Sequence, residues 1–316
     1  MAEKKIIAVV GATGAQGGGL VRAISEAGEG EFAARAITRS PHSERAQELA
    51  ALGAEVVAAD VNDPESLRRA FEGAHGVFCV TFFWEHFSPD MEIQHARNMA
   101  DAARASGVGH AIWSTLEDTR NWVPLDDDRM PTLMDRYKVP HFDAKGEANR
   151  VFEEAGVPTT FLLTSFYWDN LVHFGMGPRA DEAGNLSFAL PMGDARLPGI
   201  AAEDIGRCAL GIFRRGDEHV GRTVGIAGEH PTGAEMASVL GKALGRTVTY
   251  VAVPFASYRE LEFPGAEDLG NMFQFKHDFN DYFCGARSIE FSRSLHPGLY
   301  TFERWVDENR DRIPIQ

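Results

Sequence analysis

The chain has 316 residues and carries 31 Lys plus Arg against 46 Asp plus Glu, which gives a formal net charge of −15. Hydrophobic residues make up 44% and charged residues 24%, proportions that exclude a mainly disordered or fibrous protein. A surface this negative repels the phosphates of nucleic acids and anionic lipids, so neither direct nucleic-acid binding nor membrane binding is expected. Cys79, Cys208 and Cys284 are too far apart for a CxxC pair or a zinc motif, so no metal site is expected and a cytoplasmic location is predicted.

The first half of the chain alternates short apolar runs with helical patterns. The apolar runs predict strands at residues 6–10, 32–38, 55–59, 77–81, 110–114 and 159–163. Helices are predicted at residues 20–27, 43–52, 64 onward, 88–107 and 143–155. Continuous apolar strands separated by helices predict a parallel sheet covered on both faces, the doubly wound α/β arrangement of an NAD(P)-binding Rossmann fold.

This alternation ends near residue 164. Residues 165–200 and 250–298 are expected to be irregular, with helices at 202–214, 232–244 and 301–309 and a strand at 221–227. We therefore predict a nucleotide-binding domain over residues 1–165, with a return segment at about 200–230, and a smaller α+β domain for a substrate or partner over 166–316. The crevice between two such parts is the expected ligand site.

The strongest local signal is Gly11-Ala12-Thr13-Gly14-Ala15-Gln16-Gly17, which follows the first predicted strand and opens a helix. Gly11 permits a tight turn, Gly14 lets the backbone approach a pyrophosphate, and Gly17 lets the helix pack close to the sheet. The helix N-terminus offers N–H groups and a partial positive charge to an anion. The motif predicts a dinucleotide site, with a purely structural strand–helix turn as the alternative. Its expected binding residues are Gly11, Thr13, Gly14, Ala15, Gln16 and Gly17.

The residues after the second predicted strand select the form of the cofactor. NAD sites usually place an acidic side chain there, which accepts hydrogen bonds from the ribose hydroxyls. This sequence has Thr38-Arg39-Ser40 instead, and a guanidinium binds a 2′-phosphate but accepts no hydroxyl proton. We therefore predict that Arg39 binds NADP in preference to NAD; a solvated surface arginine is the alternative.

Two further segments follow predicted strands at the same edge of the sheet. Asp60 and Val61 follow the third strand, where a carboxylate or amide could meet an adenine amino group. Thr81, Phe82 and Phe83 follow the fourth strand, where ligands of such sheets bind. The aromatic side chains are expected either to wall the nicotinamide and its ribose or to pack over the end of the sheet.

These residues together resemble the NmrA-like family of atypical short-chain dehydrogenases, over nearly the whole chain. The matching stretches are Gly11–Gly18, Thr38-Arg39, 53–57, Trp84-Glu85, Ser114 with Leu116-Glu117, 141–147, Asn170-Leu171, 263–269 and 271–273. The resemblance implies an NADP-binding Rossmann domain, a smaller C-terminal domain, and members that act as sensors of the NADPH/NADP balance. It also implies that Tyr167 or Asn170, after the sixth predicted strand, reaches the nicotinamide end of the cofactor.

An active short-chain dehydrogenase of the wider superfamily that this chain resembles would carry a Ser and then Tyr-x-x-x-Lys on one helix. Ser114 ends the fifth predicted strand and Lys145 takes the lysine position, but His141 stands where the tyrosine would be. Pro140 places this region at or just before the start of a helix. Lys145 is predicted to bind the nicotinamide ribose, with a solvated surface lysine as the alternative. His141 is either a proton donor or a capping and packing residue.

Three functions remain open from the sequence. The first is an NADP(H) sensor with little or no dehydrogenase activity, which signals to a protein partner. The second is an NADPH-dependent reductase of a small carbonyl, imine, enone or quinone that uses Lys145, Ser114 and His141. The third is a scaffold protein that merely inherited the fold. A homodimer is a further expectation.

Overall fold

The computed structural model describes residues 4–28 and 30–316, and it divides the chain into two compact units. Unit 1 comprises Met1–Asp118, His141–Thr164 and Glu203–Val224, and unit 2 comprises Thr119–Pro140, Ser165–Ala202 and Gly225–Gln316. The predicted domain boundaries kept residues 119–140 in the nucleotide-binding part, whereas the structure assigns them to unit 2.

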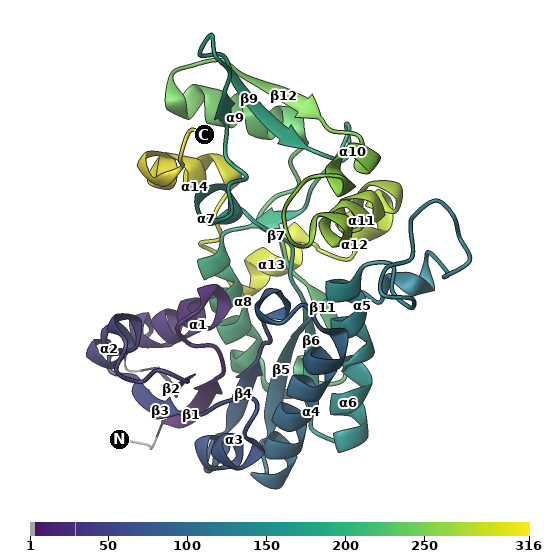
Figure 1. Ribbon diagram of the computed structural model, residues 1–316. Coiled ribbons are helices and arrows are strands. Elements are labelled where there is room, and N and C mark those ends of the chain that lie inside the picture. The colour runs from purple at the N-terminus through teal and green to yellow at the C-terminus, as the bar shows by residue number, and fades with distance from the viewer. Residues whose placement is uncertain (1–3, 29) are drawn as a thin grey trace. The chain divides into compact units, whose positions relative to one another are not determined.

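Unit 1 contains a seven-stranded sheet with the order β11-β6-β5-β4-β1-β2-β3 (Figure 1). Strands β1 to β6 pair in parallel, in registers such as Ile7 with Ala34 and Ala111 with Val77. The strands span Lys5–Val9, Phe32–Thr38, Glu55–Ala58, Gly76–Cys79, His110–Thr115, Thr159–Leu163 and, for β11, Thr223–Gly225. The sequence-based prediction of an α/β Rossmann-type fold is confirmed.

Helices cover both faces of this sheet because its strands are apolar on both sides. On one face, α3 (Pro64–Phe71), α4 (Pro89–Ala105) and α6 (Asn149–Ala155) form a continuous apolar core with the strands. On the other face, α1 (Ala15–Glu26) and α8 (Ala202–Arg214) pack against each other. The Phe213 ring of α8 contacts the rings of Phe32 and His110 on the strands. Helix α2 (Glu44–Ala51) contacts α1.

Several element boundaries differ from the sequence-based ones for identifiable reasons. Helix α1 begins at Ala15, five residues before the predicted start, because the glycines that follow Gly14 are helical. The predicted helix at 143–155 is two helices, α5 (Pro140–Glu147) and α6, so His141 lies in the first turn of α5. Strand β4 ends at Cys79, which leaves Thr81 beyond the strand.

Unit 2 contains two small sheets and several helices. Strand β7 (Phe166–Tyr167) pairs with β10 (Gly199–Ile200), and β9 (Leu186–Leu190) pairs with both β8 (Arg179–Ala180) and β12 (Val248–Ala252). The helices are α7 (Asn170–His173), α9 (Gly233–Leu244), α10 (Phe255–Arg259), α11 (Ala266–Asp278), α12 (Asn280–Gly285), α13 (Ile289–Leu295) and α14 (Phe302–Asn309). Trp168, buried beside the rings of Phe302 and Trp305, lies at the centre of one apolar cluster.

The prediction that residues 250–298 are irregular is wrong, because this segment holds four helices, α10 to α13. Nine of the 13 residues of α11 are buried, on all sides of the helix, so no polar face alternates with an apolar one. Helix α11 also holds the 119–140 segment in unit 2. The Asn271 side chain donates to the carbonyls of Pro131 (2.9 Å) and Lys138 (2.6 Å), and Gln274 donates to that of Arg129 (2.8 Å).

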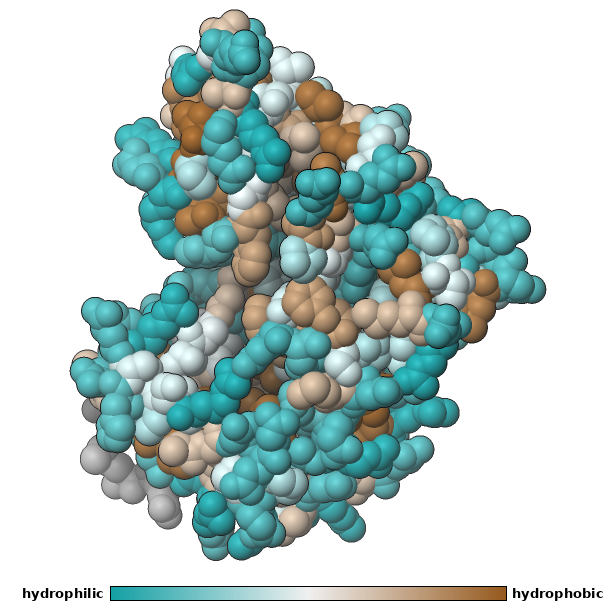
Figure 2. Space-filling view, viewed as in Figure 1, coloured by the Kyte–Doolittle hydropathy of each residue, from teal (hydrophilic) through white to brown (hydrophobic). Residues whose placement is uncertain are grey.

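The surface of the molecule is mainly polar on the face that Figure 2 draws. The hydrophobic residues on this face form small separate groups. Among residues 4–28 and 30–316, no helix combines the length and the apolar composition that crossing a bilayer requires.

Candidate functional site

The glycine loop, residues 11–17, connects the carboxyl end of β1 to the start of α1. Gly11 has a φ of +65°, a left-handed conformation that a side chain would strain, as its predicted tight turn requires. A Cβ atom at Gly17 would lie 2.5 Å from the Gly11 carbonyl oxygen, and one at Gly14 would lie 3.2 Å from it. Gly17 therefore permits close approach to the loop's own backbone, rather than to the sheet as the sequence suggested.

The N-terminus of α1 is the part of this loop suited to an anion. Gly14 is the N-cap residue and no side chain caps the helix; its first turn contains no acidic residue. Gly11, Gly14 and Ala15 are exposed, so the loop backbone is open to a ligand. Backbone N–H groups and the helix dipole would both favour a diphosphate at this position.

Ser114 lies at the carboxyl end of β5 and is buried. Its hydroxyl donates a 2.7 Å hydrogen bond to the side-chain oxygen of Gln16, in the first turn of α1. The structure thus brings together two predicted site residues that are 98 positions apart. In this arrangement Ser114 orients Gln16 and the glycine loop.

Arg39 follows β2 and is more than half exposed, but it is not a free surface arginine. Its Nη1 lies 2.7 Å from the Oε1 of Glu85, which ends a short 3-10 helix, η1 (Phe83–Glu85), beyond β4. The hydrogen bond from Arg39 to Glu85 raises the pKa of the guanidinium, against a smaller effect of desolvation. From the sequence, Glu85 belongs only to the Trp84-Glu85 stretch of the family resemblance and has no expected role, because nothing in the sequence relates it to Arg39.

Asp60 and Val61, which are predicted to contact the adenine, both form hydrogen bonds with nearby residues of the protein. The Asp60 carboxylate accepts hydrogen bonds from the backbone N–H (2.8 Å) and the side chain (3.1 Å) of Asn62. The Val61 carbonyl accepts one from the Asn98 side chain (2.7 Å) on α4. These contacts shape the turn after β3, and an adenine contact by Asp60 or Val61 remains a prediction.

The aromatic residues after β4 divide between the two expected roles. Phe83 is buried, and its ring contacts the rings of Trp84, Phe87 and His141. Phe82 is 54% exposed and remains available to a ligand. Of the two expected roles, the buried Phe83 takes the packing role, and Phe82 is left for a contact with the cofactor.

Lys145 is the centre of a buried polar cluster. It extends from α5, is almost entirely buried, and its Nζ lies 2.7 Å from Glu92 Oε1 on α4. The same ammonium donates to the Thr81 hydroxyl beyond β4, and that hydroxyl donates to Glu92. The Trp113 ring lies beneath the Lys145 Nζ, with 5.2 Å between that nitrogen and the ring centroid. Lys145 is therefore fixed at the carboxyl end of β4, beside the strand that carries the glycine loop.

Glu92 was missed by the sequence analysis. Its side chain is fully buried, and His86 Nε2 lies 3.3 Å from its second oxygen. Burial alone would raise the pKa of this carboxyl group, but the charge of Lys145, with hydrogen bonds from Lys145 and Thr81 and the nearby His86 ring, lowers it to about 2. Glu92 is thus a carboxylate and keeps a negative charge against the Lys145 ammonium. A signal existed in the sequence, since Glu92, His95 and Ala96 share the buried face of α4.

His141, which occupies the position of the dehydrogenase tyrosine, is buried in the first turn of α5. Its ring contacts Trp84 (4.7 Å between centroids) and Phe142 (4.8 Å) in addition to Phe83. This environment favours the packing role for His141. Tyr167 ends β7 and Asn170 begins α7, both in unit 2, so their place at the cofactor remains a prediction.

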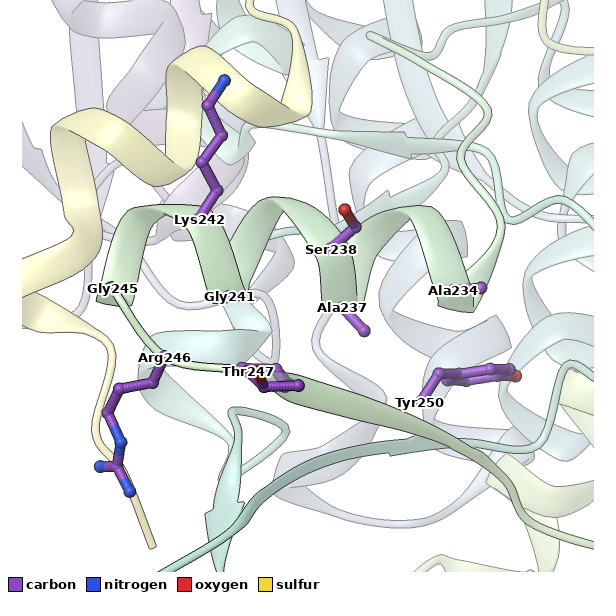
Figure 3. A pocket seen from close by; sticks show the side chains of 10 residues that line it. Ala234, Ala237, Ser238, Gly241, Lys242, Gly245, Arg246, Thr247 and Tyr250 are labelled. Atoms are coloured by element: carbon purple, nitrogen blue, oxygen red, sulfur yellow. The ribbon is translucent and has the colours of Figure 1, made fainter.

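A separate surface groove of about 570 Å³ lies between α9 and β12 in unit 2 (Figure 3). In Figure 3 the Lys242 and Arg246 side chains point away from the groove. Lys242 pairs with Glu303, and Arg246 donates to the Gly184 carbonyl. The groove therefore has no converging charged groups. Its lining residues are Ala234, Ala237, Ser238, Gly241, Lys242, Gly245, Arg246, Thr247, Val248 and Tyr250.

Comparison with known proteins identifies relatives along almost the full chain. The model of the NmrA-like family matches residues 3–306. The NmrA-like family domain-containing oxidoreductase FrzB of Cladobotryum sp is 30% identical over 290 residues, 85% of this chain and 83% of that protein. The NAD(P)H azoreductase of Xenophilus azovorans is 30% identical over 249 residues, 78% of this chain and 77% of that protein.

Solved structures give the same relationship. NmrA, a negative transcriptional regulator, has crystal structures in complex with NAD and with NADP. Each is 26% identical to this chain, has a TM-score of 0.78, and covers 97% of this chain and 95% of that one. The chain belongs to the NmrA-like family.

Proposed function

We propose that this member of the NmrA-like family binds NAD(P)(H), prefers NADP(H), and acts as a sensor of the cofactor's redox state with little or no dehydrogenase activity. The observation that carries the binding proposal is the glycine loop. It combines a left-handed Gly11, a Gly17 that tolerates no Cβ, and an uncapped, exposed helix N-terminus. Two structures of NmrA hold NAD and NADP, which supports the same ligand class here.

In this proposal each part of the dinucleotide has its own residues. Thr13, Gly14, Ala15 and Gln16 would bind the diphosphate at the start of α1, and Arg39 would bind the 2′-phosphate. Lys145 would donate to the nicotinamide ribose from the end of β4. When bound, the nicotinamide could supply or accept a hydride, and the protein would contribute position and charge.

The sensor role is supported by what surrounds the expected catalytic groups. The tyrosine acid is replaced by His141, whose buried ring packs on Trp84 and Phe142. Lys145 is held by a buried ion pair with the Glu92 carboxylate and by the Thr81 hydroxyl. In this proposal these residues bind and orient a cofactor rather than protonate a substrate. The likeness along the 263–273 segment leads us to place this chain near the human family member HSCARG.

A second candidate is an NADPH-dependent reductase of a small carbonyl, imine, enone or quinone that uses Lys145. The relative named NAD(P)H azoreductase, 30% identical over 78% of this chain, favours it. In this case Lys145, together with Ser114 and His141, would provide the polar side chains around the nicotinamide.

The test is to measure the affinities of NADPH, NADP, NADH and NAD by calorimetry and then to assay turnover with a panel of acceptors. Binding without turnover, together with a change of partner or oligomer that follows the redox state, is expected for the sensor. Oxidation of NADPH by an acceptor would establish the reductase instead, and failure to bind any of the four would leave a scaffold.

Gly17→Ala makes the test specific to the glycine loop. Its Cβ would collide with the Gly11 carbonyl, so we expect nucleotide affinity to fall at least tenfold, a loss of about 1.4 kcal/mol or more. Gly30→Ala is the matched control, because its Cβ would make only ordinary contacts at 3.4 Å. Unchanged affinity in Gly17→Ala would remove the loop from the binding site.

A further inference from the structure

The ion pair between Arg39 and Glu85 joins two segments on either side of the glycine loop. Arg39 directly follows β2, and Glu85 ends the η1 turn beyond β4. Strand β1, which leads into the glycine loop, pairs with β2 on one side and with β4 on the other. The 2.7 Å contact between Arg39 Nη1 and Glu85 Oε1 therefore links the two strands that flank the loop.

The guanidinium that would bind a 2′-phosphate is thus already surrounded by negative charge. Glu85 bonds to it directly, and the carboxylate of Asp60 also acts on it electrostatically. A phosphate on Arg39 must share the guanidinium with Glu85 or displace it, and the two anions repel each other at such short range. The 2′-hydroxyl of NAD meets no such repulsion, and a carboxylate can accept a hydrogen bond from it.

We propose that Glu85 is a specificity-determining residue, whose carboxylate competes with the 2′-phosphate for Arg39 and so lowers the preference for NADP over NAD. The proposal rests on the proposed NAD(P) binding and adds a residue from a distant part of the sequence to it. The sequence lacks an acid after β2, but the fold supplies one there from beyond β4. Arg39 and Glu85 therefore act together as a site that accepts both forms of the cofactor.

The exposure of the Arg39–Glu85 ion pair determines how strongly Glu85 weakens the binding of NADP. The side chains of Arg39 and Glu85 are 56% and 50% exposed, so solvent and salt screen their interaction. Exposed pairs of this kind contribute up to about 1 kcal/mol, which corresponds to roughly a fivefold change in an equilibrium constant. The carboxylate is therefore expected to tune the preference for NADP and not to abolish the binding of NADP.

Glu85→Gln tests the proposal, because it removes the charge and keeps the size of the side chain. We expect the ratio of NADP affinity to NAD affinity to rise about two- to fivefold, through tighter NADP binding, with NAD affinity unchanged or weaker. The increase should be largest at low ionic strength and should shrink as salt is added. Calorimetry with NADP and NAD at two salt concentrations measures both effects.

Glu55→Gln is the matched control. Glu55 pairs with Arg35 at the same 2.7 Å and is 54% exposed, but it stands at the opposite, N-terminal end of β3. Removal of the Glu55 charge should leave the ratio of NADP affinity to NAD affinity unchanged.

The possible failures are distinguishable. If the unmodified protein binds neither nucleotide, the proposed function fails. If it binds both and Glu85→Gln leaves the ratio unchanged, or weakens both nucleotides equally, the proposed role of Glu85 is overturned while the binding function stands. A thermal melt of each variant identifies any loss of folding, and the salt dependence of NADP binding by the unmodified protein then tests the competition without a mutation.

Discussion

Replacement of Glu92 by glutamine should remove a buried ion pair and, with it, one source of the pH dependence of the protein's stability. Glu92→Gln keeps the shape of the side chain and a hydrogen-bond acceptor, but it leaves the Lys145 ammonium without its buried counter-charge. Removal of one partner from such a pair costs about 3–5 kcal/mol. We therefore expect the variant to be less stable than the unmodified protein at pH 7 by an amount in this range.

The part of this difference that depends on pH follows from the pKa of Glu92. The pKa is lowered from 4.5 to about 2 in the folded protein, which at 1.36 kcal/mol per pKa unit corresponds to about 3 kcal/mol. Because the folded-state pKa is the lower one, this stabilisation is complete well above pH 4.5 and is lost as the pH falls toward 2. About 2 kcal/mol of it should be lost by pH 3.

Urea unfolding of both proteins at pH 7, 5, 4 and 3 measures the effect. The difference in the free energy of unfolding between the unmodified protein and Glu92→Gln should narrow by about 2 kcal/mol between pH 7 and pH 3. Glu65→Gln serves as the control, because Glu65 is 68% exposed in its pair with Arg68, and its replacement should cost far less stability at pH 7. A Glu92→Gln difference that is the same at pH 7 and pH 3 would refute the buried-carboxylate argument.

Two other substitutions test parts of unit 1. Arg39→Asp should reverse the preference between NADP and NAD in a calorimetric titration, since an aspartate repels the 2′-phosphate and accepts from the ribose hydroxyls; an unchanged preference would contradict the assignment of Arg39. Gly206→Ala should destabilise the protein by at least about 1–3 kcal/mol in urea unfolding, because its Cβ would overlap the backbone of Leu20 where α8 crosses α1. Gly285→Ala, whose Cβ meets nothing within 4 Å, should cost far less, and equal losses would argue against a tight crossing.

The pattern of apolar runs along the chain was sufficient to predict the sheet of unit 1. Strands β2 and β6 lie where the apolar runs predicted them, and the other strands differ by a few residues at their ends. Local signals of this kind work because the strands are short apolar runs and some helices begin at a local cap, such as Ser43 or Asp63. Helices α10 to α13 were missed because α11 buries residues on all sides and so lacks an amphipathic period.

By itself, the sequence determined the Rossmann-type fold, the glycine loop and the NmrA-like resemblance, because these depend on residues close together in the chain. Only the tertiary structure placed Glu85 against Arg39 and Glu92 against Lys145, pairs separated by 46 and by 53 positions. Charge acts through space, so the electrostatic environment of a side chain depends on which strands lie next to each other in the sheet. That adjacency is set by the fold, and the spacing of residues along the chain does not reveal it.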